Sequence, residues 1–170
     1  MASVICHNKR NWLLITFDQW RGDWLNQHWL RLPQMKKIAR EGWHLNRCYT
    51  SSPQCVPARV SWLTGKKPKE LGLTRNNPYT VGTNANSFVR ELRDQHGYYT
   101  SLFGKTHWTP HGVPGDLRDN LPLLNSLGFE RAVEIAGPRA LRHKECELTD
   151  LWRKHGFYEE YVNDLNLRYD

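Results

Sequence analysis

Residues 55–65 read Cys-Val-Pro-Ala-Arg-Val-Ser-Trp-Leu-Thr-Gly, and this stretch anchors the interpretation of the whole chain. Residues 58–64 predict a short helix, since Gly65 is a typical stop and Pro57 suits a first turn, where its missing N–H costs nothing. Cys55 then lies just before a helix N-terminus. The helix dipole and the free N–H groups at that place favour an anion.

Apolar segments and helical segments alternate along the rest of the chain. Residues 11–17 (Asn-Trp-Leu-Leu-Ile-Thr-Phe) form a nearly continuous apolar run, which is typical of a strand buried on both faces of a parallel sheet. Further strands are expected at 43–50, 98–103 and 131–135, further helices at 33–41, 86–95, 121–127 and 145–155, and loops at 51–57 and 104–120. The alternation predicts an α/β fold, with a mostly parallel sheet flanked by helices.

Reactive side chains follow three of the predicted strands. Asp18 and Gln19 come directly after residues 11–17, Cys55 lies in the loop after the second strand, and Lys105 and His107 follow the third. Ligands gather at the carboxyl ends of strands in open α/β sheets. We therefore expect these side chains to line one shared cleft.

Length and charge limit the class of protein. The chain has 170 residues and a formal net charge of +7, from 24 Lys and Arg against 17 Asp and Glu. The length predicts one domain over residues 1–170, with a core that needs no disulfide or metal. The positive charge indicates an anionic partner. The basic cluster at 66–69 is too short for a nucleic-acid-binding stripe, and no nucleic-acid-binding module is present.

The cysteines and the N-terminal residues indicate a cellular setting. No two of the four cysteines form a Cys-x-x-Cys pair, which argues against a zinc ribbon. No apolar run approaches the roughly 18 residues of a membrane helix, and residues 1–11 lack the apolar stretch of a secretory signal. These patterns predict no disulfide framework, no membrane span and a cytoplasmic location. Cys6, Cys48 and Cys146 are expected to be ordinary thiols.

Residues 55–59 (Cys-Val-Pro-Ala-Arg), followed by Leu-Thr-Gly at 63–65, resemble the signature of the sulfatase family of the alkaline-phosphatase superfamily. The family pattern is Cys-x-Pro-Ser/Ala-Arg, three further residues and Leu-Thr-Gly, and every fixed position matches. Residues 104–107 (Gly-Lys-Thr-His) are similar to the family's Gly-Lys-x-His motif. The resemblance covers residues 11–112 and implies the N-terminal portion of an alkaline-phosphatase-like fold.

The resemblance implies hydrolysis of a sulfate monoester. Cys55 would be oxidised by a separate maturing enzyme to formylglycine, whose hydrated form attacks sulfur with one hydroxyl and expels sulfate with the other. Arg59 would hold this diol and neutralise charge around it. Lys105 would bind the sulfuryl oxygens, and His107 would orient or deprotonate the diol.

The resemblance also implies a divalent cation that polarises the ester. Asp18, Gln19 and the modified Cys55 would be its ligands. Most sulfatases carry Asp-Asp at this place, and Asp-Gln resembles choline-sulfatase-like and phosphonate monoester hydrolase-like members. Since both side chains offer oxygen, Ca²⁺ is expected, with Mg²⁺ or Mn²⁺ as alternatives.

Sulfatases run to several hundred residues, so the resemblance implies a truncated chain or one that a second chain completes. The family's later metal-binding pair has one counterpart by residue type, Asp119-Asn120, which lies in a polar segment and is set aside. Activity is therefore expected to need the missing part. His111 has no counterpart in the family's motifs and is expected to be structural.

Two alternatives stay open. A phosphonate or phosphate monoester hydrolase is one, because residues 18–21 (Asp-Gln-Trp-Arg) resemble that group. Such enzymes tend to replace the Lys and His that this chain keeps at 105 and 107, which favours sulfate. A non-catalytic remnant that binds anions is the other, and the intact motif at Cys55 argues against it.

Overall fold

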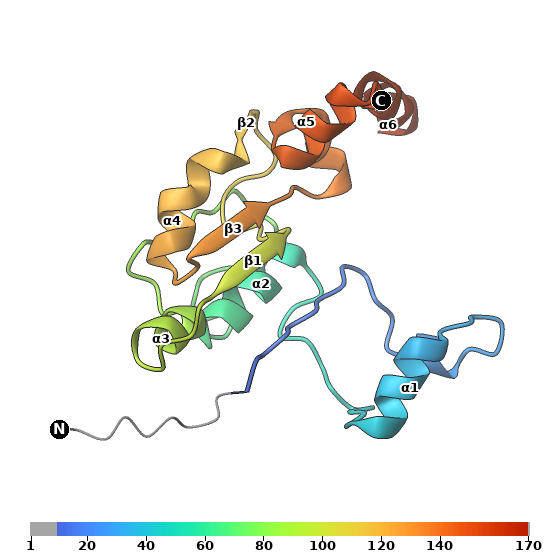
Figure 1. Ribbon diagram of the computed structural model, residues 1–170, viewed down its shortest axis with the longest axis vertical. Coiled ribbons are helices and arrows are strands. Elements are labelled where there is room, and N and C mark those ends of the chain that lie inside the picture. The colour runs from blue at the N-terminus through green and yellow to red at the C-terminus, as the bar shows by residue number, and fades with distance from the viewer. Residues whose placement is uncertain (1–9, 170) are drawn as a thin grey trace. The chain divides into compact units, whose positions relative to one another are not determined.

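The computed structural model describes residues 10–169, and its chain contacts form two compact units that divide between Cys48 and Tyr49. Figure 1 shows the ribbon of both units, coloured along the chain. The positions 1–9, which include Cys6, and position 170 lie outside the described residues. No helix in the described part of the chain is long and apolar enough to cross a membrane.

Within residues 10–48, the first unit contains one α-helix, α1 (Pro33–Glu41), and a short 3-10 helix, η1 (Trp24–Asn26). Pro33 occupies the first turn of α1, and the N–H of Gly42 closes the last turn on the carbonyl oxygen of Ile38 at 2.9 Å. Proline at the start and glycine at the end are the signals that predicted this helix from the sequence. The prediction of a helix over 33–41 is confirmed.

The strands predicted at 11–17 and 43–50 are wrong. Residues 10–48 contain no strand, and the apolar side chains of both segments are exposed, with Leu13 at 85% and Trp43 at 94%. A strand needs a partner strand for its backbone and a packed layer for its side chains. An apolar run indicates only that a segment can be buried. It does not identify the partner strand, which comes from elsewhere in the chain.

As far as it is described, up to Tyr169, the second unit contains five α-helices, four short strands and two 3-10 helices. Its elements are α2 (Cys55–Thr64), α3 (Phe88–Asp94), β1 (Ser101–Gly104), β2 (Gly115–Asp116), η2 (Leu117–Asn120), α4 (Leu121–Ser126), β3 (Arg131–Glu134), η3 (Pro138–Arg142), β4 (Lys144–Glu145), α5 (Glu147–Lys154) and α6 (Tyr158–Tyr169). The four predicted helices and two predicted strands in this unit are present, with ends shifted by up to three residues. The predicted loop at 104–120 contains β2 and η2.

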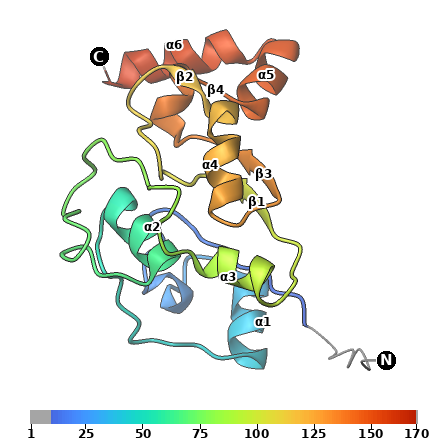
Figure 2. The same ribbon diagram turned by 90° about the vertical axis from the view of Figure 1, so that its left-hand side faces the viewer.

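Both strand pairs are parallel, as an α/β fold requires. β1 lies beside β3 with Gly104 opposite Glu134 (Figure 1). β2 lies beside β4 (Figure 2). The helices α5 and α6 and the β2–β4 pair gather at one end of this unit (Figure 2). The two-residue strands β2 and β4 escaped sequence analysis because so short a pair carries no periodic signal.

The core of the second unit has two apolar clusters. The larger one surrounds α2 and includes the completely buried Trp108, whose ring lies 5.7 Å from that of Phe129. The smaller one contains Leu117, Ala136, Leu141 and Cys146. Cys146 is thus a buried thiol, whereas Cys48 is exposed.

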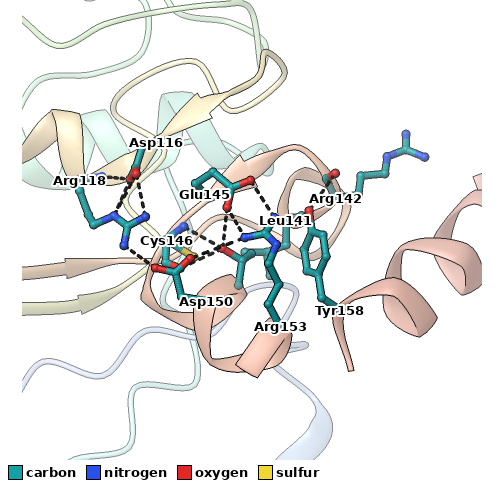
Figure 3. A network of polar contacts seen from close by, with 10 residues as sticks. Asp116, Arg118, Leu141, Arg142, Glu145, Cys146, Asp150, Arg153 and Tyr158 are labelled. Carbon is teal, nitrogen blue, oxygen red and sulfur yellow. Dashed lines mark hydrogen bonds and ion pairs between the residues drawn. The ribbon is translucent and has the colours of Figure 1, made fainter. Parts of the chain in front are cut away.

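Charged side chains join η2 to α5, and α5 to β4, in the second unit (Figure 3). Arg118 lies 2.7 Å from a carboxylate oxygen of Asp116 and 2.5 Å from one of Asp150, and Arg153 pairs with Glu145. The hydrogen bonds from Arg118 lower the pKa of Asp116. Because these side chains are partly exposed, solvent screens the pairs and each contributes little to stability.

Candidate active site

Cys55 is the first residue of α2, so the helix begins three residues earlier than predicted. Two hydrogen bonds of the first turn explain the early start. The N–H of Val56 donates to the Asn76 side chain at 2.9 Å, and the N–H of Ala58 donates to the Gln54 carbonyl at 3.1 Å. The side chain of Asn76, which satisfies one free N–H of the first turn, comes from 20 residues away. Cys55 is partly exposed, at a helix N-terminus that favours negative charge.

Lys105 approaches Cys55 from the loop that follows β1. Its Nζ lies 3.4 Å from Cys55 Sγ, although the two residues are 50 positions apart. A Cβ added to Gly137 would lie 3.4 Å from the same Nζ, so the lysine side chain passes directly over this glycine. The structure thus brings a nucleophilic atom and a cation together at the carboxyl end of a strand.

Arg59 lies one turn after Cys55 on α2 and is buried. Its guanidinium donates a hydrogen bond to the backbone carbonyl oxygen of Lys105. The indole N–H of Trp108 donates in the opposite direction, to the carbonyl oxygen of Arg59, at 3.2 Å. These two bonds fasten α2 to the loop that carries Lys105.

His107 has a left-handed backbone, with φ of 58°, which side-chain-bearing residues rarely adopt. Its ring stacks on that of His111 with 4.6 Å between ring centres. A hollow of about 150 Å³ lies beside these two rings, and its lining includes Val56, Asn76 and Tyr79. This hollow next to the first turn of α2 is large enough for a small polar group.

Asp18 and Gln19, the predicted metal ligands, lie in an exposed turn of the first unit, and Gln19 has φ of 59°. Their approach to Cys55, which belongs to the second unit, stays a prediction. The carboxylate and amide oxygens of these two side chains are ligand types that suit a hard cation. However, residues 10–169 contain no group of three or more His, Cys, Asp or Glu side chains that could hold a metal ion.

Glu134 is a site residue that sequence analysis missed. It is buried at the end of β3, and its carboxylate accepts hydrogen bonds from Thr106 Oγ1, from His111 Nε2 at 3.3 Å and from Asn120 Nδ2 at 2.9 Å. Burial alone would raise the pKa of Glu134, but these hydrogen bonds outweigh it and hold the pKa below its ordinary value. The signal that could have indicated Glu134 is an acidic residue at the end of a strand, where that strand lies beside the Gly-Lys-x-His segment.

The network also accounts for residues that sequence analysis left aside. Asn120, half of the discarded Asp119-Asn120 pair, uses its amide nitrogen on Glu134 and on Thr109 Oγ1 at 3.0 Å. His111, expected to be structural, is 3% exposed and bridges Glu134 to His107. Thr106 is the variable position of the Gly-Lys-x-His motif.

The fold and the site define an α/β protein that places a cysteine at a helix N-terminus. The amine of a lysine contacts the cysteine sulfur, and a histidine follows that lysine two residues later on the same loop. The sequence model of the sulfatase family matches residues 10–167, and the chain belongs to that family.

Three curated relatives illustrate the similarity. The arylsulfatase of Clostridium perfringens is 32% identical over 105 residues, which are 60% of this chain and 22% of the relative. The choline-sulfatase of Rhizobium meliloti is 33% identical over 103 residues, 59% of this chain and 20% of the relative. The ulvan-active sulfatase of Formosa agariphila is 31% identical over 106 residues, 61% of this chain and 20% of the relative. The matched part spans about a fifth of the length of these relatives.

Proposed function

We propose that this chain carries the nucleophile and the anion-binding residues of an enzyme that hydrolyses a sulfate monoester. The observation that carries the proposal is the 3.4 Å approach of Lys105 Nζ to Cys55 Sγ. A cation in contact with the nucleophile attracts an anionic ester and stabilises the charge that develops on its oxygens. The family membership and the names of the relatives support sulfate as the group transferred.

The proposed nucleophile is formylglycine, made from Cys55 by a separate maturing enzyme. Its hydrated form supplies one hydroxyl that bonds to sulfur while the alcohol leaves, and a second hydroxyl whose deprotonation releases sulfate and restores the aldehyde. The first turn of α2 presents Cys55 with its side chain partly exposed, so both a maturing enzyme and an ester can reach it.

The other residues of the site have separate tasks. Lys105 neutralises the sulfuryl oxygens from its position on Cys55. His107, two residues further on the same loop, moves a proton to or from the nucleophile. Arg59 adds positive charge beside Cys55 and holds the loop through the Lys105 carbonyl oxygen. Each task requires the loop after β1 to stay fixed against α2.

The complete enzyme needs components that this chain does not supply. Asp18 and Gln19 are proposed to hold a divalent cation, Ca²⁺ in the first place and Mg²⁺ or Mn²⁺ otherwise, which would polarise the ester when bound. Because the matched part spans about a fifth of the relatives, the remaining ligands and the contacts to the alcohol are proposed to come from further sequence or a second chain.

The first test is modification of Cys55. Coexpression with a sulfatase-maturing enzyme should lower the intact mass by about 18 Da, and peptide mapping should place the change at Cys55. Cys55→Ala should show no such change, whereas Cys48→Ala should keep it. An unchanged mass, under conditions that modify an established sulfatase, would contradict the proposed nucleophile.

The second test is the choice of ester. The matured chain, with the complementary part of the enzyme supplied, should hydrolyse an aryl sulfate faster than the corresponding aryl phosphate or phosphonate. Lys105→Gln should reduce this sulfatase activity by roughly a hundredfold, because one preorganised charge is lost from the transition state. Preference for the phosphonate would instead assign the chain to the other hydrolase class of the superfamily.

A further inference from the structure

We propose that Glu134 is the positioning residue of this site, because its carboxylate fixes the loop that carries Lys105 and His107. The inference rests on the proposed function for the tasks of Lys105 and His107, and it adds how these two side chains are held in place. Among the described residues, no hydrogen bond joins Glu134 to Cys55. Glu134 acts through Thr106 and His111.

The sheet places Glu134 beside the loop. Glu134 ends β3 and lies opposite Gly104, the last residue of β1, in a parallel register. Lys105 follows Gly104 immediately, so the backbone pairing delivers the carboxylate to the first residues of the loop. The Glu134 side chain is 2% exposed, which leaves its oxygens to protein donors.

The carboxylate is matched by three donors from three segments. Thr106 lies in the loop itself, His111 lies five residues further, and Asn120 ends η2. Because the pKa of Glu134 is lowered by these bonds, the carboxylate is charged near neutral pH and can only accept. It therefore orients the Thr106 hydroxyl and fixes the Nε2–H form of the His111 ring.

The loop needs such a constraint, since its backbone is unfavourable. Gly104 has φ of 108° and His107 has φ of 58°, with only two residues between them. A left-handed histidine persists only where the surroundings determine it. Glu134 holds the loop before this residue through Thr106, and it supports the His107 ring through the stacked ring of His111.

A role limited to stability would have a different consequence. Loss of a purely stabilising contact lowers the free energy of unfolding but leaves Lys105 on Cys55 in the folded molecules. Loss of a positioning contact moves Lys105 away while the chain remains folded. The contact of Lys105 Nζ with Cys55 Sγ is thus the quantity to measure.

The ratio of two alkylation rates reports this contact. Iodoacetate and iodoacetamide attack the same thiolate, so the rate ratio at Cys55 cancels the thiolate fraction and depends on nearby charge. The unmodified 170-residue chain, verified by intact mass, is alkylated and peptide-mapped, and Cys55 in the urea-unfolded chain is the reference. In the folded wild type, Lys105 should raise the ratio about fivefold over this reference.

Three variants separate the two roles. Thr106→Val keeps the shape of the side chain but loses the hydroxyl, and the Cys55 ratio should fall at least about twofold. Thr106→Ser restores the hydroxyl and should keep the wild-type ratio. Ser87→Ala removes another buried hydroxyl, which lies outside the site and donates to the Leu127 carbonyl oxygen at a distance of 2.5 Å. This variant should lower stability without changing the ratio.

Glu134→Ala removes the acceptor itself and, in folded protein, should lower the ratio as Thr106→Val does. If it does not fold, the Thr106 variants decide. An unchanged ratio in folded Thr106→Val, or an equal fall in Ser87→Ala, would overturn the positioning role. Failure of the proposed function is distinguishable from this result, because it shows in formylglycine formation and ester turnover, which the alkylation ratio does not measure.

Discussion

The indole N–H of Trp108 lies 3.2 Å from the backbone carbonyl oxygen of Arg59, and the guanidinium of Arg59 in turn donates to the carbonyl of Lys105. These two contacts connect the helix of the nucleophile to the loop of its neighbouring cation in both directions. Trp108 is completely buried, and the one polar atom of its side chain forms this hydrogen bond. The separation of Cys55 and Lys105 is therefore set by the core as well as by the sheet.

Replacement of Trp108 by Phe should destabilise the chain by about 2 kcal/mol, because it loses a buried hydrogen bond and leaves a small cavity. Urea unfolding followed by circular dichroism measures the change. Trp62→Phe is the control, since Trp62 is half-buried and packs edge-on against Trp108 with ring centres 5.6 Å apart. An equal loss in both variants would contradict a specific role for the Trp108 N–H.

Replacement of Gly128 by Ala should be severely destabilising. Gly128 has φ of 110°, and an added Cβ would lie 2.3 Å from the backbone nitrogen of Arg90. Neither backbone can give way without separating α3 from the turn after α4. We expect a loss of about 3 kcal/mol or more, which is roughly 6–12 °C in melting temperature for a chain of this size.

Gly82→Ala is the matched control, because an added Cβ at Gly82 meets nothing within 4 Å. Its melting temperature should stay within a few degrees of the wild type. A wild-type melting temperature in Gly128→Ala would show that the close approach to Arg90 is not a constraint on the fold.

Removal of the positive charge in Lys105→Gln should reduce the iodoacetate to iodoacetamide rate ratio at Cys55 about fivefold. Two unit charges about 4 Å apart interact by roughly 1 kcal/mol in water, which corresponds to that factor. Lys66→Gln removes an exposed charge just beyond the opposite end of α2 and should leave the ratio unchanged. Equal effects of the two substitutions would mean that only the net charge of the chain is measured.

The carboxylate of Glu134 should contribute stability that acid removes. Its pKa is lowered in the folded chain from an ordinary value of 4.5, so its contribution is complete above that value and is lost as the pH falls through the lower, folded-state pKa. The difference in unfolding free energy between wild type and Glu134→Gln should be constant from pH 5 to 7, roughly the range above the ordinary pKa. Below about pH 4.5 this difference should shrink. Urea titrations at successive pH values measure it, and a difference that grows in acid would contradict the charged state.

Ca²⁺ should bind the 170-residue chain weakly. Asp18 and Gln19 offer two oxygen donors and one formal negative charge, whereas Ca²⁺ takes six to eight oxygen ligands. Affinity should rise when the missing part of the enzyme is supplied. Calorimetry with Ca²⁺ and Mg²⁺ measures it, with Asp18→Ala as the control. A tight stoichiometric site that disappears in Asp18→Ala would mean that this chain completes its own metal site.

Local signals in the sequence determined the helices and the chemistry-bearing motifs. Pro33 and Gly42 delimit α1, and Gly65, with φ of 71°, ends α2 in the left-handed conformation that glycine adopts easily. The fixed positions around Cys55 and Lys105 identified the family before any fold was known. Such features could be predicted because each depends on residues that are neighbours along the chain.

Tertiary structure decided which strands form and what holds the site. The apolar run at 11–17 predicted a strand and is exposed, whereas the two-residue strands β2 and β4 pair without any signal in the sequence. Glu134 reaches its three donors, at positions 106, 111 and 120, in a structure where β3 lies beside β1. Strand pairing and a buried charge depend on partners that lie far away along the chain, and folding alone brings these partners together.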